Sequence, residues 1–197
     1  LSVYPDLASP QEMSFTDISN AVAAFMEFEW RSDTAPFDAL LAGKESFSGA
    51  QARGLELFYG AAGCSACHSG PLLTDFDFHA MGQPQLGPGK AARFERHARD
   101  EGRFRVTGRE ADRFSFRTPS LRNVALTGPW GHSGAYADLG SFVAAHADPR
   151  AALRSYDRSG VVLPEFEAAD WRIMDDPAEV AVISAAVEVM PLALEAQ

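Results

Sequence analysis

The chain has 197 residues, of which 46% are hydrophobic, 16 are glycine, 12 are proline and two are cysteine, which excludes collagen-like, low-complexity and disulfide-scaffold proteins. This length suffices to bury a core in one domain with an additional segment, or in two small domains. The 17 basic and 27 acidic residues give a net charge of −10, so we expect neither nucleic acid nor an anionic membrane surface as a partner. No apolar run approaches the roughly 20 residues that span a bilayer, and the N-terminus lacks the pattern of a signal peptide, so we expect no membrane insertion.

Residues 14–30 are predicted to form the first helix. Ser14 is its expected N-cap, and residues 33–36 break it. Its apolar side chains recur at helical spacing: Ile18, Val22, Phe25 and Met26.

A second helix is predicted to begin at Ser48. Gln51, three residues on, completes a capping box, and Leu55 and Phe58 continue the apolar face. The helix runs into a stretch rich in glycine and alanine, so we expect the sequence that follows, residues 63–68, to lie at its end.

The two cysteines form a C-x-x-C-H motif. Cys64 and Cys67 stand three residues apart, and His68 follows directly. This is the pattern of covalent c-type haem attachment, in which the two thiols form thioethers to the porphyrin and the histidine ligates iron. The motif therefore predicts one covalent haem c, with His68 as the proximal ligand.

Three other interpretations of this motif compete with haem attachment. A thioredoxin-like dithiol belongs in a βαβ unit and needs no histidine, and a zinc site needs further ligands, for which there is no second cysteine pair. A disulfide between the two cysteines is the third. Because thioether attachment takes place outside the cytoplasm, the haem interpretation also predicts a periplasmic protein.

The second half of the chain is predicted to be irregular at first and then helical. Residues 71–113 are rich in glycine, proline and charge, and His97 lies among arginines, which is typical of a surface position. A short helix is expected to begin at Asp138 and to end before Pro149. Its apolar positions Leu139, Phe142 and Val143 are joined by His146, which should therefore point inward.

A last helix is predicted to start at Pro177. Its apolar residues are Val180, Ile183, Val187 and Met190. No internal repeat is present, and no segment has the pattern of a strand.

Three sequence blocks carry a family resemblance. They are Gly54-x-x-Leu57-Phe58 before the C-x-x-C-H motif, Ser69-Gly70-Pro71 through Phe78-His79-x-x-Gly82, and Phe116-Arg117-Thr118-Pro119-Ser120-Leu121-Arg122-Asn123 through Pro129, followed by His132 and Gly134. Together they resemble the C-terminal half of bacterial dihaem cytochrome c peroxidases and of their relatives, the methylamine dehydrogenase maturation enzymes. Residues 14–43 resemble the linker and late helices of the first half.

The resemblance implies a mainly α fold in two parts. Residues 1–45 would be a helical segment from the end of the N-terminal haem domain and the linker, and residues 46–197 a C-terminal cytochrome c domain with long irregular loops. In the family, the N-terminal haem reacts with peroxide, and the C-terminal haem relays electrons from a small donor such as a cytochrome c or cupredoxin. The expected partners within an assembly are an N-terminal haem domain or a second copy of this chain in a homodimer.

The sixth iron ligand departs from the family pattern. Relatives place methionine or tyrosine on the helix after the Pro-x-x-His-x-Gly segment, and the matching residue here is His146. We therefore predict axial ligation by His146, and a bis-histidine iron has a lower potential than a histidine–methionine one. His79 and Met81 are the alternative ligands, and His132 is expected to be a hydrogen-bonding group near the haem.

Two further sets of residues are candidates by resemblance. Arg117 and Arg122 are expected to pair with the haem propionates, with surface salt bridges as the alternative. The family also binds Ca²⁺ through backbone carbonyls that match Thr127 and Pro129. Because the first domain normally supplies another ligand, this calcium site is the weaker expectation.

The sequence is compatible with two main functions. One is the electron-transfer domain of a peroxidase-type oxidoreductase, and the other is a free-standing monohaem electron carrier without catalysis. In a third hypothesis, His146 turns away and the open iron handles peroxide with His79 or His132 as acid and base. Alone, the chain is expected to be weakly active or inactive.

Overall fold

We describe a computed structural model of the chain, which covers residues 4–29, 31, 34–86, 99–162 and 169–188. The chain divides into two compact units, Leu1–Arg53 and Gly54–Gln197, and each is described by itself. The division expected from the sequence, between residues 45 and 46, concerns the domains of a whole protein and stays a prediction.

Unit 1 is helical. It contains a 3-10 turn (Pro10–Glu12), α1 (Phe15–Glu29), α2 (Pro36–Leu41) and the first residues of α3 (Gly49–Tyr59). Ser14 caps α1, since its hydroxyl accepts the N–H of Asp17 at 3.3 Å while its own N–H donates to Asp17 Oδ2 at 2.8 Å. The predicted start of this helix is confirmed. The apolar stripe lies along α1, and its four side chains are exposed: Ile18, Val22, Phe25 and Met26.

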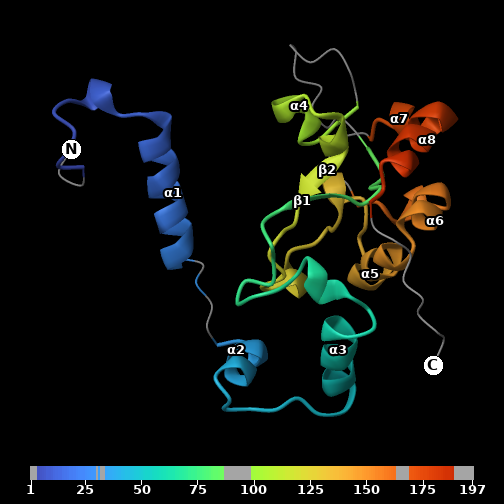
Figure 1. Ribbon diagram of the computed structural model, residues 1–197, viewed down its shortest axis with the longest axis horizontal. Coiled ribbons are helices and arrows are strands. Elements are labelled where there is room, and N and C mark those ends of the chain that lie inside the picture. Colours follow the sequence, from blue (N-terminus) through green and yellow to red (C-terminus); the bar gives the residue numbers. More distant parts are fainter. Residues whose placement is uncertain (1–3, 30, 32–33, 87–98, 163–168, 189–197) are drawn as a thin grey trace. The chain divides into compact units, whose positions relative to one another are not determined.

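Unit 2 holds the remaining elements, which are mostly helices (Figure 1). After α3 they are the 3-10 turn η2 (Cys64–Ala66), β1 (Phe78–Ala80), α4 (Phe104–Thr107), η3 (Glu110–Asp112), β2 (Ser115–Arg117), η4 (Val124–Leu126), η5 (His132–Gly134), α5 (Leu139–Ala147), α6 (Pro149–Arg154), η6 (Arg158–Gly160), α7 (Arg172–Asp175) and α8 (Pro177–Ala185). A mainly α fold is therefore confirmed. Within the described ranges, no helix is long and apolar enough to cross a membrane.

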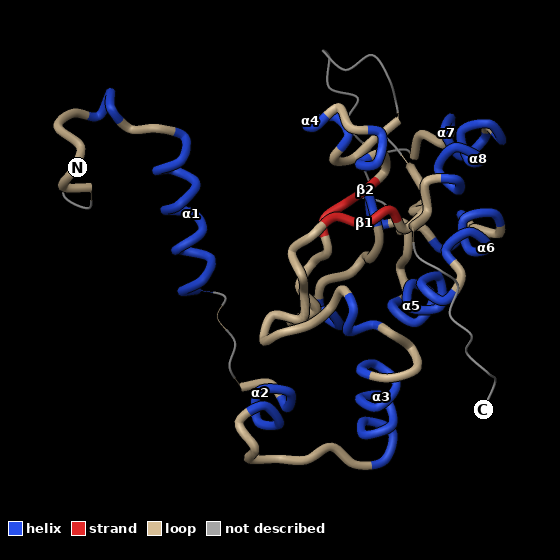
Figure 2. The backbone as a smooth tube through the Cα atoms, viewed as in Figure 1, coloured by secondary structure: helices blue, strands red, loops and turns tan. Residues whose placement is uncertain are grey.

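The expectation that the chain has no strand is wrong. Strands β1 and β2 pair antiparallel, with His79 opposite Phe116 and Ala80 opposite Ser115 (Figure 2). Each strand has only three residues, which is too short for an alternating pattern to be visible in the sequence. The ladder joins the segment after the C-x-x-C-H motif to the start of the sequence block Phe116–Pro129, one of the three that carry the family resemblance.

The core of unit 2 lies where α6, α7 and α8 meet the segment before β2. Phe114, Leu153 and Ile183 are buried there. They are packed against by four partly buried side chains: Ile173, Met174, Val180 and Ala186. The Arg150 side chain also donates from Nε to the carbonyl of Ser184 at 3.2 Å, which fastens α6 to the end of α8.

Most predicted helices are present, with two corrections. The helix before the motif ends at Tyr59, so residues 64–66 form a separate 3-10 turn. Pro149 does not simply end a helix; it begins α6, with Asp148 accepting the N–H of Ala151 at 2.9 Å. This is consistent with the tolerance of the first helical position for proline, whose missing N–H would have no partner there.

The two other predicted helices begin as expected. Asp138 caps α5 by accepting the N–H of Ser141 at 2.7 Å, and Asp176 caps α8 by accepting the N–H of Ala178 at 2.8 Å. On α8, Ile183 is buried, and Val187, just beyond its end, is buried too. His97 and Met190 lie outside the described residues.

Candidate functional site

The C-x-x-C-H motif forms one tight turn. Gly63 precedes it with a φ of 62°, and the carbonyl of Cys64 accepts the N–H of His68 at 2.9 Å. The Cys64 and Cys67 thiols are half-buried and not joined in a disulfide. Burial raises the pKa of both, and the charges of Asp75 and Asp77 raise that of Cys67 further. The turn thus presents two protonated thiols and an imidazole within five residues of backbone.

A backbone carbonyl a few residues further along the chain fixes the orientation of the His68 ring. Its Nδ1 lies 3.1 Å from the oxygen of Leu73, and because a carbonyl can only accept, this nitrogen carries the ring proton. Leu73 is in the left-handed region, with a φ of 52°, in a turn closed by its N–H to the carbonyl of Gly70 at 3.1 Å. Burial lowers the pKa of His68, and the nearby charge of His146 lowers it further. His68 is therefore neutral near pH 7, and no described residue hydrogen-bonds to its Nε2, the atom that a metal would use.

His146 on α5 has the same arrangement. Its Nδ1 lies 2.8 Å from the carbonyl oxygen of Phe142, one turn earlier. The Phe142 ring meets the imidazole edge to face, with centroids 4.6 Å apart. The His146 side chain is half-buried, in line with the inward direction expected from the sequence. Val143, which the sequence places on the same apolar face, is 60% exposed.

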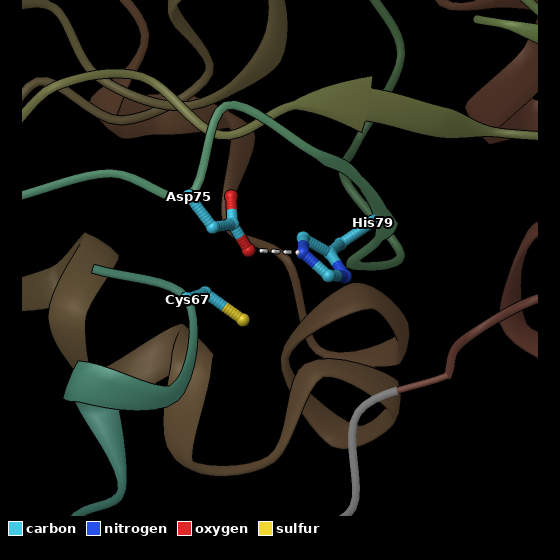
Figure 3. Close-up of side chains that lie close together, drawn as sticks. All are labelled: Cys67, Asp75 and His79. Carbon is cyan, nitrogen blue, oxygen red and sulfur yellow. Dashed lines mark hydrogen bonds and ion pairs between the residues drawn. The ribbon is translucent and has the colours of Figure 1, made fainter. Parts of the chain in front are cut away.

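His79 has its Nε2 in use. This atom lies 2.8 Å from Asp75 Oδ2. Although burial opposes it, hydrogen bonds from His79, the Asp77 backbone and Thr118 hold the pKa of Asp75 at about 2. Cys67 completes a group whose ligand atoms all lie within 4.8 Å of one another (Figure 3). To ligate iron through Nε2, His79 would have to give up its hydrogen bond to Asp75. His146 would lose no such bond among the described residues, because its carbonyl partner is bound to Nδ1.

His132 belongs to a separate hydrogen-bonded arrangement. Its ring stacks on Phe116, with centroids 4.0 Å apart, and its Nε2 lies 3.3 Å from Asp100 Oδ2. The backbone N–H of His132 donates to Gln83 Oε1 at 3.4 Å. These contacts agree with a hydrogen-bonding role for His132. Met81, the other alternative ligand, is half-buried.

The arginine and calcium candidates lie between the end of β2, which is Arg117, and η5. Arg117 is exposed, with its guanidinium 4.7 Å from the ring centre of Phe76. Arg122 is half-buried, and its backbone N–H donates to Ser120 Oγ at 3.2 Å. Thr127 and Pro129 are exposed and are linked through a cis Gly128–Pro129 bond. Their assignments to propionates and calcium stay predictions.

Sequence reasoning missed the groups that orient these side chains. The carbonyls of Leu73 and Phe142 and the carboxylates of Asp75 and Asp100 each hold a histidine. Phe142 and Asp75 could have been found, since each lies four residues before its histidine. The Leu73 carbonyl could not, because its direction depends on a backbone conformation that leucine seldom adopts.

The donor set fits a covalent haem. Two thiols on one turn match two thioether bonds, and the Nε2 atoms of His68 and His146, which have no hydrogen-bond partner among the described residues, are the type of donor that a haem iron takes. Together with the mainly α fold, these features define a site of the c-type cytochrome class.

No protein-family model matches the chain, but individual proteins do. It is 39% identical over 145 residues to the cytochrome-c peroxidase IdrP1 of Denitromonas iodatirespirans, a match covering 63% of this chain and 39% of that protein. It is 41% identical over 112 residues to the methylamine utilization protein MauG of Methylorubrum extorquens, covering 55% and 28%. It is 34% identical over 145 residues to the cytochrome c551 peroxidase of Pseudomonas aeruginosa, covering 72% and 39%.

A solved structure gives the same result. The crystal structure of a MauG-like protein associated with microbial copper homeostasis matches with a TM-score of 0.56 and 32% identity, over 73% of this chain and 42% of that one. The chain thus belongs with the bacterial cytochrome c peroxidases and MauG proteins, as its sequence blocks predict. It spans well under half the length of the curated relatives it matches.

Proposed function

We propose that this chain is the electron-transfer haem domain of a periplasmic, cytochrome c peroxidase-like oxidoreductase. The observation that carries the proposal is the matched pair of imidazoles. His68 and His146 both have Nδ1 fixed by a carbonyl, and no hydrogen bond occupies either Nε2 within the described ranges. Bound to one haem iron, these two histidines would leave no position open for peroxide, which suits electron relay.

The residues that would hold the haem follow from the site. Cys64 and Cys67 would provide the thioether bonds, His68 and His146 the axial ligands, and Arg117 and Arg122 the cations for the propionates. Bound haem c supplies a centre that accepts and gives up one electron at a time. Arg117 already lies over the ring of Phe76, so its guanidinium is placed near the segment that follows the motif.

The polypeptide's part in the reaction is to fix the orientation and the protonation of the two imidazoles. The carbonyls of Leu73 and Phe142 set which ring nitrogen carries the proton, so both imidazoles are held in the orientation and tautomer that an iron ligand would need. Burial keeps His68 neutral, as an iron ligand must be. A fixed ligand pair keeps the reorganisation that accompanies electron transfer small.

The remaining parts of the proposal concern partners. The net charge of −10 favours a small electron donor with a basic surface, such as a cytochrome c or a cupredoxin. Two relatives are named as peroxidases of cytochromes c, which supports peroxide as the final oxidant in the whole protein. That reaction would take place at a haem in a partner domain. The carbonyls of Thr127 and Pro129 would take up calcium, as the family resemblance of the sequence implies.

Counting haems tests this proposal. The native protein, purified with its whole polypeptide, is analysed by mass spectrometry and by the pyridine haemochrome assay. We expect two haems per whole molecule, one of them on this chain and low-spin in the ferric state. Because this chain contains a single C-x-x-C-H motif, one haem per whole molecule would favour a monohaem electron carrier instead.

A further inference from the structure

The loop that follows the C-x-x-C-H motif has a strained backbone. It comprises residues 72–77 and carries Asp75, which is labelled in Figure 3. Leu73 and Phe76 have φ angles of 52° and 58°, in the left-handed region that residues other than glycine seldom adopt. A backbone of this kind persists only where the surrounding contacts fix it. Its conformation bears on the site because the carbonyl of Leu73 accepts the Nδ1 proton of His68.

Thr74 stands between the two strained residues and is buried, with 6% of its surface exposed. Its hydroxyl donates to the carbonyl of Thr118 at 2.8 Å and accepts the N–H of Phe76 at 3.0 Å. Its own N–H donates to the carbonyl of Ser69 at 2.9 Å. A buried hydroxyl without partners would carry a desolvation cost, and here it both donates and accepts. Thr74 therefore fastens the loop at the residue that directly follows Leu73.

The segment that receives this contact is the Thr-Pro-Ser part of a sequence block that carries the family resemblance. The hydroxyl of Ser120 donates to the carbonyl of Leu72 at 2.6 Å, and the N–H of Thr118 donates to the carbonyl of Asp77 at 2.8 Å. Together with the bond from Thr74, three hydrogen bonds thus connect the loop to this segment. They fix the loop on both sides of the carbonyl that accepts the imidazole proton.

We propose that Thr74 is a positioning residue for His68, acting through the Leu73 carbonyl, and that it thereby lowers the reduction potential of the haem iron. The inference deepens the proposed function and rests on its assignment of His68 as an iron ligand. An imidazole whose Nδ1–H donates a hydrogen bond is a more basic ligand, which favours ferric over ferrous iron. The Thr74 hydroxyl keeps the acceptor carbonyl in place, so its loss should weaken that bond and raise the potential.

Reduction potentials of Thr74 variants test the proposal. The variants are made in the whole protein with its haem attached, and the potential is measured by potentiometric titration with redox mediators. Thr74→Val keeps the side-chain shape but removes the hydroxyl, so we expect an upward shift, smaller than that caused by replacing an iron ligand. Thr74→Ser keeps the hydroxyl and should retain the wild-type potential. Exchange of the His68 Nδ1 proton with D₂O, followed by NMR, should be faster in Thr74→Val and unchanged in Thr74→Ser.

Two further substitutions make the test decisive. Ser120→Ala removes another of the three hydrogen bonds at an exposed position. It should shift the potential in the same direction but less, and it serves in place of Thr74→Val should that variant not fold. Thr107→Val removes a hydroxyl on α4 that donates to Asp112 Oδ2 at 2.6 Å, and it should leave the potential unchanged. This control separates an effect on His68 from a general loss of stability in unit 2.

Three results would overturn the inference. In the first, Thr74→Val and Ser120→Ala have the wild-type potential and the wild-type rate of Nδ1 proton exchange. In the second, Thr74→Ser shifts the potential as far as Thr74→Val, so that side-chain volume and not the hydroxyl is responsible. In the third, Thr107→Val shifts the potential equally. None of these results changes the haem count or the spin state of the native protein, so failure here is distinguishable from failure of the proposed function.

Discussion

His68 and His146 are oriented by the same device although they lie on different elements. Each ring places Nδ1 against a backbone carbonyl, that of Leu73 at 3.1 Å for His68 and that of Phe142 at 2.8 Å for His146. Burial lowers the pKa of His68, and the charges of His146 and His79 lower it further. A pair prepared in this way is expected to give a low-spin iron.

Replacing His146 tests this pairing directly. His146→Ala removes one of the two free Nε2 atoms, so we expect the ferric haem protein to change from low-spin to high-spin. Electron paramagnetic resonance and the visible spectrum report the change. Val143→Ala, an exposed position on the same helix, is the control and should stay low-spin. A His146→Ala protein that is still fully low-spin would show that another residue ligates the iron.

His79→Asn separates the two histidine candidates. Because His79 Nε2 is bound to Asp75 Oδ2 at 2.8 Å, we expect its replacement to leave the ferric spectrum low-spin. If His79→Asn becomes high-spin while His146→Ala does not, the assignment of the axial ligand is reversed. The same spectra, recorded side by side, decide between them.

The chemical type of the second ligand should set the reduction potential. His146→Met replaces an imidazole by a thioether, which stabilises the reduced iron, so the potential should rise by on the order of 100 mV. Potentiometric titration with redox mediators measures it. His132→Gln, which alters a histidine bound to Asp100 Oδ2 rather than a proposed ligand, should change the potential far less. An unchanged potential in His146→Met would mean that residue 146 does not ligate the iron.

The Asp75–His79 pair should make stability depend on acid pH. Hydrogen bonding, working against burial, lowers the pKa of Asp75 from 3.8 to about 2 in the folded chain. A depressed carboxyl pKa contributes stability that is complete above the unfolded value of 3.8 and is lost as the pH falls through about 2. Allowing for solvent screening, the contribution near neutral pH is about 1 kcal/mol.

Urea unfolding of wild type and Asp75→Asn measures this contribution. The free energy of unfolding should differ by that amount at pH 7, and the difference should shrink as the pH falls from about 4 to about 2. Asp77→Asn is the control, because it removes a neighbouring carboxylate while leaving the hydrogen bond between Asp75 and His79 in place. A difference that does not vary with pH would mean that the charge of Asp75 is not what stabilises the fold.

Helix starts and the haem motif were predictable from the sequence because their signals are local. The caps at Ser14 and Asp138 act on residues three positions away, and C-x-x-C-H is contiguous. The pairing of His79 with Phe116 across β1 and β2 was not predictable, since it joins short segments far apart in the chain. Val143 shows a further limit: helical spacing put it on the apolar face, yet α5 leaves it exposed because the helix packs only along part of that face.

Gly82 follows β1 and lies close to the end of α8, and this contact gives a last prediction. Its φ is 59°, and a Cβ there would lie 2.7 Å from Val187 Cγ2 and 3.6 Å from the carbonyl oxygen of Pro149. Gly82→Ala should therefore cost both backbone strain of about 1 kcal/mol and an overpacking penalty of about 1–3 kcal/mol. Gly108 has a similar φ, 67°, with nothing within 4 Å of its Cβ position, so Gly108→Ala should show the strain alone.

Denaturant unfolding of the two alanine variants measures the difference between these positions. Adding Val187→Ala to Gly82→Ala should recover part of the lost stability, because the smaller side chain leaves room for the new methyl group. Val187→Ala alone should be destabilising, since Val187 is only 4% exposed. If Gly82→Ala lowers the free energy of unfolding no more than Gly108→Ala does, close packing of Gly82 against Val187 does not stabilise unit 2.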